Sequence, residues 1–119
     1  MAGTGKTAFA VHAAHNLAGK FPDGQYFLPL HSHMPGQRPV SAADALASLL
    51  LTTGVAPQRI PPGLEARASW WREQVADNRI LLVLDDVAGH EQVRPLLPGN
   101  AGSLVLITSR RRLTARPSR

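Results

Sequence analysis

The sequence contains no cysteine, and its 119 residues include no apolar run long enough to cross a membrane. The missing thiols exclude a disulfide scaffold and any thiolate metal site, and they are compatible with a reducing cytosol. A membrane helix needs about 18 apolar residues, whereas the longest runs here are residues 45–51 and 80–84. No basic stretch leads into an apolar one at the N-terminus, as it would in a signal peptide. We therefore expect a cytoplasmic protein with no membrane partner.

The net charge of +5 comes from the C-terminus. Residues 1–109 contain eight basic and all eight acidic side chains, so this stretch is neutral. The excess consists of five arginines, at positions 110, 111, 112, 116 and 119. A nucleic-acid-binding domain spreads basic charge over a folded face, so this distribution argues against one. We interpret residues 114–119 as a basic tail or a cut linker.

Helices and strands are expected to alternate along a single domain, and 44% hydrophobic residues suffice for its core. The expected helices cover residues 8–18, 41–53, 64–76 and 90–97. The expected strands cover residues 24–30, 80–84 and 103–108. The last two strands are continuous apolar runs, typical of strands buried on both faces. This alternation predicts an α/β fold with a parallel sheet, while residues 110–119 offer little to fold around.

A glycine-rich segment, Gly3-Thr4-Gly5-Lys6-Thr7, directly precedes the first expected helix. It matches the end of the phosphate loop G-x-x-x-x-G-K-[S/T], whose first glycine would fall before the first residue. Glycines let backbone N–H groups converge on phosphate oxygens, and a helix N-terminus adds partial positive charge. In this pattern the lysine reaches the β- and γ-phosphates and Thr7 ligates Mg²⁺. The alternative is an ordinary glycine-rich helix start.

Two acids follow the apolar run of residues 80–84. A buried strand that ends in a carboxylate matches the Walker B pattern, and ligands gather at the carboxyl ends of strands in open α/β sheets. Asp85 would hold Mg²⁺, directly or through water. Asp86 could polarise the attacking water as a general base. The alternative is two acids that end a strand and start a turn.

A second buried strand is followed by Thr108, Ser109 and Arg110. Thr108 or Ser109 could sense the γ-phosphate or its water. Arg110 could pair with phosphate oxygens through its planar guanidinium. The alternative is that Arg110 begins a solvated basic run.

Together, residues 2–7, 79–87 and 102–110 resemble the NB-ARC family of signal-transduction ATPases. The resemblance spans residues 1–113 and is strongest to actinobacterial regulators that join an NB-ARC module to a DNA-binding activator domain and tetratricopeptide repeats. It implies a P-loop NTPase-type sheet with flanking helices, and ADP or ATP with Mg²⁺ as cofactors. It also implies a switch with slow hydrolysis, in which ADP is held in the resting state.

The same resemblance implies that parts of the family's domain are missing: its first strand, its C-terminal helical segment and its winged helix. It places the missing strand between residues 80–84 and 103–108. Each unpaired buried group would cost about 1–3 kcal/mol, against a total stability of ~5–15 kcal/mol. We therefore expect a marginally folded or rearranged chain that binds nucleotide poorly. Direct pairing of the two strands, or a start codon further upstream, remains an alternative.

Histidine pairs at His12 and His15, and at His31 and His33, could each reach one metal ion. No carboxylate stands at a convincing spacing beside either pair, so we expect surface or packing histidines instead of a zinc site. On its amphipathic helix, Trp71 is expected in the core.

The leading hypothesis is an ADP/ATP-binding fragment of a bacterial NB-ARC regulatory switch ATPase, impaired by truncation. Its partners would be the nucleotide, the missing parts of its parent chain and, through the parent, nucleic acid. The alternatives are another P-loop ATPase or small kinase, and a non-catalytic interaction module whose basic tail contacts nucleic acid. The predicted nucleotide-binding residues are Gly3, Thr4, Gly5, Lys6, Thr7, Ala8, Thr108 and Ser109; Thr7 and Asp85 bind the metal, and Asp86 and Arg110 are catalytic.

Overall fold

The computed structural model describes residues 2–33, 35–109 and 113–118, with residues 2–6 described by their backbone. The main elements are α1 (Ala2–Leu17), β1 (Gly24–Pro29), α2 (Ala42–Thr52), α3 (Leu64–Gln74), β2 (Ile80–Val87), α4 (His90–Val93), β3 (Leu104–Ser109) and β4 (Leu113–Pro117). Three short 3₁₀ turns are η1 (Ala18–Lys20), η2 (Pro57–Arg59) and η3 (Arg94–Leu96). The α/β class expected from the alternating pattern is confirmed.

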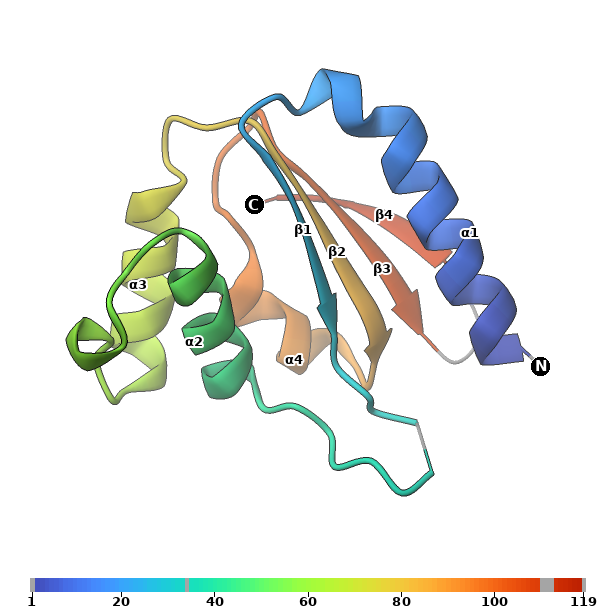
Figure 1. The fold of residues 1–119 in the computed structure, drawn as a ribbon, viewed down its shortest axis with the longest axis horizontal. Coiled ribbons are helices and arrows are strands. Elements are labelled where there is room, and N and C mark those ends of the chain that lie inside the picture. Colours follow the sequence, from blue (N-terminus) through green and yellow to red (C-terminus); the bar gives the residue numbers. More distant parts are fainter. Residues whose placement is uncertain (1, 34, 110–112, 119) are drawn as a thin grey trace.

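One four-stranded sheet runs through the molecule in the order β1-β2-β3-β4. The first three strands are parallel, and β4 is antiparallel to β3. Helix α1 covers one face of the sheet over β2 and β3, and α2, α3 and α4 lie on the other face (Figure 1). The three parallel strands end at the same edge of the sheet, where α1 also begins (Figure 1).

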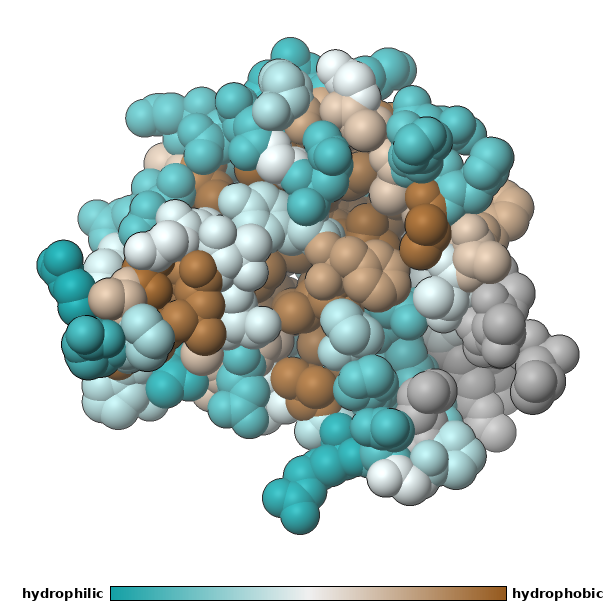
Figure 2. Space-filling view, in the orientation of Figure 1, coloured by the Kyte–Doolittle hydropathy of each residue, from teal (hydrophilic) through white to brown (hydrophobic). Residues whose placement is uncertain are grey.

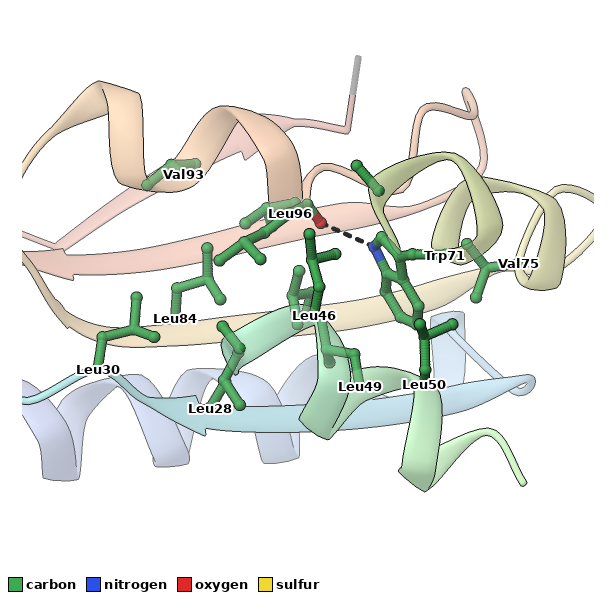
Figure 3. Close-up of a cluster of buried hydrophobic side chains, with 14 of the residues drawn as sticks. Leu28, Leu30, Leu46, Leu49, Leu50, Trp71, Val75, Leu84, Val93 and Leu96 are labelled. Atoms are coloured by element: carbon green, nitrogen blue, oxygen red, sulfur yellow. Dashed lines mark hydrogen bonds between the residues drawn. The ribbon is translucent and has the colours of Figure 1, made fainter. Parts of the chain in front are cut away.

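The larger core lies between the sheet and helices α2 to α4. Trp71 is fully buried there, as expected, and its indole Nε1 donates a 2.9 Å hydrogen bond to the Leu96 carbonyl (Figure 3). Tyr26 of β1 meets the Trp71 ring edge-on, with 5.5 Å between ring centroids. The N-terminus of α2 is fixed by Ser41, whose side chain accepts a hydrogen bond from the Asp44 amide.

A smaller core lies under α1. Ala10 packs there with Leu81 and Val83 of β2 and Leu106 of β3. Strand β1 extends beyond this cover, and Phe27 is 45% exposed. Figure 2 shows apolar side chains gathered over the strands beside α1. One face of the sheet is therefore covered less completely than the other.

Three expectations from the sequence are corrected by this fold. The gap expected between residues 80–84 and 103–108 is absent, because β2 and β3 pair directly, with Leu81 beside Leu104 and Leu84 beside Ile107. Direct pairing satisfies the backbone groups of both buried strands, so the alternative left open above is the arrangement found.

The second correction concerns the C-terminus. Residues 113–117 form β4 and pair with β3 along its outer edge, so they are not a tail outside the folded structure. Without this pairing, the outer backbone groups of a buried strand would lack partners.

The third correction concerns the glycine-rich segment, which was expected to precede the first helix. The backbone is already helical from Ala2 onward, six residues before the expected start. Alanine, lysine and the backbone hydrogen bonds of a continuing helix offset the two glycines, which cost about 1 kcal/mol each in a helix interior.

None of the helices in the described residues is both long and apolar enough to span a bilayer. Among the same residues, no three His, Asp or Glu side chains gather into a metal-binding group.

Candidate functional site

The candidate site lies at the carboxyl edge of the parallel strands. The sheet brings the ends of β2 and β3 side by side, which places Asp85 and Asp86 next to Thr108 and Ser109. The first turns of α1 reach the same edge, where Thr7 contacts Asp85. Three segments that are distant in the sequence therefore meet at one place.

Asp85 is the centre of this cluster, and it is only 9% exposed. The Thr7 hydroxyl lies 3.0 Å from Oδ1 and 3.1 Å from Oδ2 of the carboxylate. The Thr108 hydroxyl donates a 2.6 Å hydrogen bond to Oδ1. Asp85 thus accepts from two hydroxyl groups, one on α1 and one on β3.

The oxygen atoms of this cluster fit a magnesium ion. Carboxylate and hydroxyl oxygens are hard ligands, which Mg²⁺ prefers. Two adjacent ligands of an octahedral Mg²⁺, each ~2.05 Å from the metal, are about 2.9 Å apart. The Thr7 and Asp85 oxygens lie 3.0 Å apart, which is compatible with both being ligands of one ion.

Thr108 is almost fully buried and has two partners. Its hydroxyl donates to Asp85 and accepts a 2.8 Å hydrogen bond from the Asp86 amide. Because a hydroxyl has one proton, Thr108 cannot at the same time donate to a phosphate. The arrangement therefore makes Thr108 a residue that orients Asp85, whereas Ser109 is partly exposed at the end of the same strand.

Asp86 follows with an unusual backbone conformation, φ 61°. Left-handed φ values are uncommon for residues other than glycine, but Asp and Asn adopt them more readily than other residues. The Asp86 carboxylate points to the turn after β1: it accepts a 2.9 Å hydrogen bond from the His33 amide and lies 2.8 Å from His33 Nδ1. The Asp86 carbonyl accepts a further bond from the Ser32 amide.

His33 is a residue of this site that the sequence did not reveal. From the sequence, His31 and His33 were weighed as a metal pair and expected to be surface or packing histidines. The signal available in advance was their position after one strand, since parallel neighbours end at the same edge of a sheet. The sequence does not indicate which strands are neighbours, so the contact between the strands of residues 24–30 and 80–84 could not be predicted.

The remaining predicted residues are placed less completely. The backbone of Gly3, Thr4, Gly5 and Lys6 forms the first turns of α1, while their side chains lie outside the description. The side chain of Ala8 is exposed on α1. Arg110 lies outside the described residues. The structure thus brings Thr7, Asp85, Asp86, Thr108 and Ser109 to one edge.

A cavity of about 270 Å³ lies elsewhere in the molecule. Its lining includes Gly54, Arg59, Trp70 and Gln74, from the end of α2, from η2 and from α3. Among the predicted site residues that the structure describes, none lines it.

The chain is similar to regulatory proteins of Streptomyces. It is 42% identical over 111 residues to the regulatory protein AfsR of Streptomyces coelicolor. It is 41% identical, over the same length, to the regulatory protein AfsR of Streptomyces griseus. Each match covers 93% of this chain and 11% of the relative. No protein-family profile matches the chain, and no solved structure is significantly similar to it. The chain is therefore related to a small part of much longer bacterial regulatory proteins.

Proposed function

We propose that this chain is the nucleotide-binding part of a bacterial regulatory ATPase of the NB-ARC type, which binds ADP and ATP with Mg²⁺ in the cytoplasm. The observation that carries the proposal is the contact between Thr7 and Asp85, which are 78 residues apart in the sequence. In phosphate-loop proteins the hydroxyl after the lysine and the carboxylate that ends a buried strand bind the same Mg²⁺.

The phosphates would lie at the N-terminal end of α1. The first N–H groups of a helix have no partner within it, and they carry partial positive charge. Lys6 would add a full charge toward the β- and γ-phosphates. A loop that wraps the phosphates requires the first turn of α1 to open, and Gly3 and Gly5 make this turn the weakest part of the helix.

The bound Mg²⁺ would neutralise charge on the β- and γ-phosphate oxygens. Asp86 would accept a proton from water as the water oxygen bonds to the γ-phosphorus. The bond from that phosphorus to ADP then breaks, and the products are ADP and phosphate. Arg110 would pair with the γ-phosphate oxygens.

The relatives support the regulatory part of the proposal, since both are named regulatory proteins. Because this chain corresponds to 11% of their length, the rest of such a protein would carry the helical segment, winged helix, repeats and nucleic-acid contacts. ADP or ATP at the candidate site would then bias the arrangement of those parts.

Titration with a fluorescent ADP analogue tests the proposal. We expect saturable, Mg²⁺-dependent binding to the unmodified chain, and an affinity at least about tenfold lower for Lys6→Ala, since a lysine–phosphate contact is charge-assisted. Lys20→Ala is the matched control, because Lys20 lies in η1 at the opposite end of the same helical segment. Equal affinity for all three proteins would overturn the nucleotide proposal.

A further variant tests the metal. Asp85→Asn should bind the ADP analogue with little dependence on Mg²⁺, because the neutral amide loses the charged ligand. Phosphate release with and without candidate acceptors would then separate a switch ATPase from a small kinase.

A further inference from the structure

We propose that His33 is a positioning residue that holds the Asp86 carboxylate in place for proton transfer. This inference rests on the proposed function, because it concerns how Asp86 is held for the step assigned to it. The supporting observation is a contact at the sheet edge: His33, in the turn after β1, contacts both carboxylate oxygens of Asp86, near the end of β2.

The two acids of the site are held by different parts of the molecule. Asp85 is held by hydroxyl groups from α1 and β3. The Asp86 side chain is held by His33 alone among the described contacts of its carboxylate, with Oδ2 on the backbone amide and Oδ1 on the ring nitrogen. Removing the imidazole would therefore release one oxygen of Asp86 and leave Asp85 unchanged.

The turn that carries His33 is itself fixed. Its Ser32 amide donates to the Asp86 carbonyl, and its Ser32 hydroxyl contacts Oε1 of Gln92 at 3.2 Å. Gln92 also bonds to the Val40 carbonyl, and the Val40 amide bonds to the Leu30 carbonyl, which closes the loop at its base. The imidazole is therefore presented from a fixed backbone and can define the direction of the carboxylate.

The contact leaves Asp86 able to act. An ionised carboxylate has about four acceptor positions, and His33 occupies two of them. The Asp86 side chain is one-fifth exposed, so a water molecule can approach the remaining positions. His33 thus restricts the rotation of the carboxylate without blocking it, as a group that prepares a base for proton transfer must do.

Steady-state ATP hydrolysis by His33→Ala, His33→Asn and Asp86→Asn tests the role. We expect His33→Ala to lower kcat about tenfold, the factor for one hydrogen bond to a charged group, with KM and ADP affinity unchanged. His33→Asn supplies a donor near the Nδ1 position and should recover most of kcat. His33→Ala should have no added effect in Asp86→Asn. The matched control is His31→Asn, which changes a histidine in the same turn and tolerates its φ of 55°.

In the hydrolysis and binding assays, three results would overturn the inference: a kcat loss in His31→Asn equal to that in His33→Ala, equal losses in kcat and ADP affinity for His33→Ala, or additive effects in the double variant. An unmodified chain that binds no ADP would instead refute the proposed function.

The nitrogen NMR signals of His33 test its contact with Asp86 independently of nucleotide binding. We expect a proton on Nδ1 in the unmodified chain and on Nε2 in Asp86→Gly, which keeps the left-handed backbone and lacks the acceptor. The same tautomer in both would refute the positioning role.

Discussion

Thr108 allows the candidate site to be tested through stability alone. Its buried hydroxyl donates to Asp85 at 2.6 Å and accepts from the Asp86 amide at 2.8 Å. Thr108→Val keeps the shape of the side chain and removes both hydrogen bonds. The bond to a charged carboxylate contributes about 2 kcal/mol, and the unsatisfied amide adds about 1 kcal/mol. We therefore expect the free energy of unfolding to fall by about 3 kcal/mol.

Thr108→Ser is the matched variant, because it keeps the hydroxyl and removes one buried methyl group. That loss costs about 1 kcal/mol. The difference of about 2 kcal/mol between the variants corresponds to a factor of about 30 in the folding equilibrium, since 1.4 kcal/mol is tenfold. Both substitutions occupy the same buried position, so the informative result is which variant has the lower free energy of unfolding.

Urea denaturation followed by circular dichroism measures both effects. With a slope of about 1.5 kcal/mol per molar urea, the midpoint should fall by about 2 M for Thr108→Val and by about 0.7 M for Thr108→Ser. An unchanged midpoint for Thr108→Val, above that of Thr108→Ser, would show that the hydroxyl contributes nothing, and the description of Asp85 as a doubly hydrogen-bonded group would be wrong.

Two other predictions concern α1 and the core. Gly5→Ala should stabilise the first turn of α1 by up to about 1 kcal/mol and weaken ADP binding, because the turn opens less readily. The control is Gly19→Ala, which adds a methyl group in open space and should leave ADP binding unchanged. Tighter ADP binding by Gly5→Ala would contradict the reasoning. Burial raises the pKa of Tyr26 above its ordinary value of 10.0, so the folded chain holds the phenol proton more tightly than the unfolded chain. This stabilisation is complete below the ordinary pKa and is lost as the pH rises through the raised one. Relative to Tyr26→Phe, the unmodified chain should therefore lose stability above about pH 10 in urea titrations, and parallel pH profiles would contradict this.

The elements predicted best are those whose local pattern agrees with their surroundings. The apolar run of residues 80–84 became β2 because both faces of that strand are covered, and Ser41 caps α2 as its position before an apolar segment indicated. The buried position of Trp71 also followed from its helix face. In each case a short stretch of sequence contains the physical reason.

The parts that were mispredicted depend on neighbours that are far away in the sequence. Strand β4 has the sequence Leu-Thr-Ala-Arg-Pro, with no strand pattern of its own, and it forms against the edge of β3. The contact of His33 with Asp86 requires β1 and β2 to be adjacent, which only the sheet order reveals. The location of Asp85 and Thr108 at strand ends was predictable, whereas the hydrogen bond between them was not.

The distance along the chain between Thr7 and Asp85 has a consequence for biosynthesis. During translation Thr7 leaves the ribosome long before its partner, which is 78 residues downstream, has been synthesised. The strand that carries Asp85 lies between β1 and β3 in the sheet, and pairing between strands so far apart in the sequence makes folding slow. The cluster is therefore complete only after Thr108 has been synthesised, and a chain terminated before residue 85 would carry the glycine-lysine segment without its acidic partner.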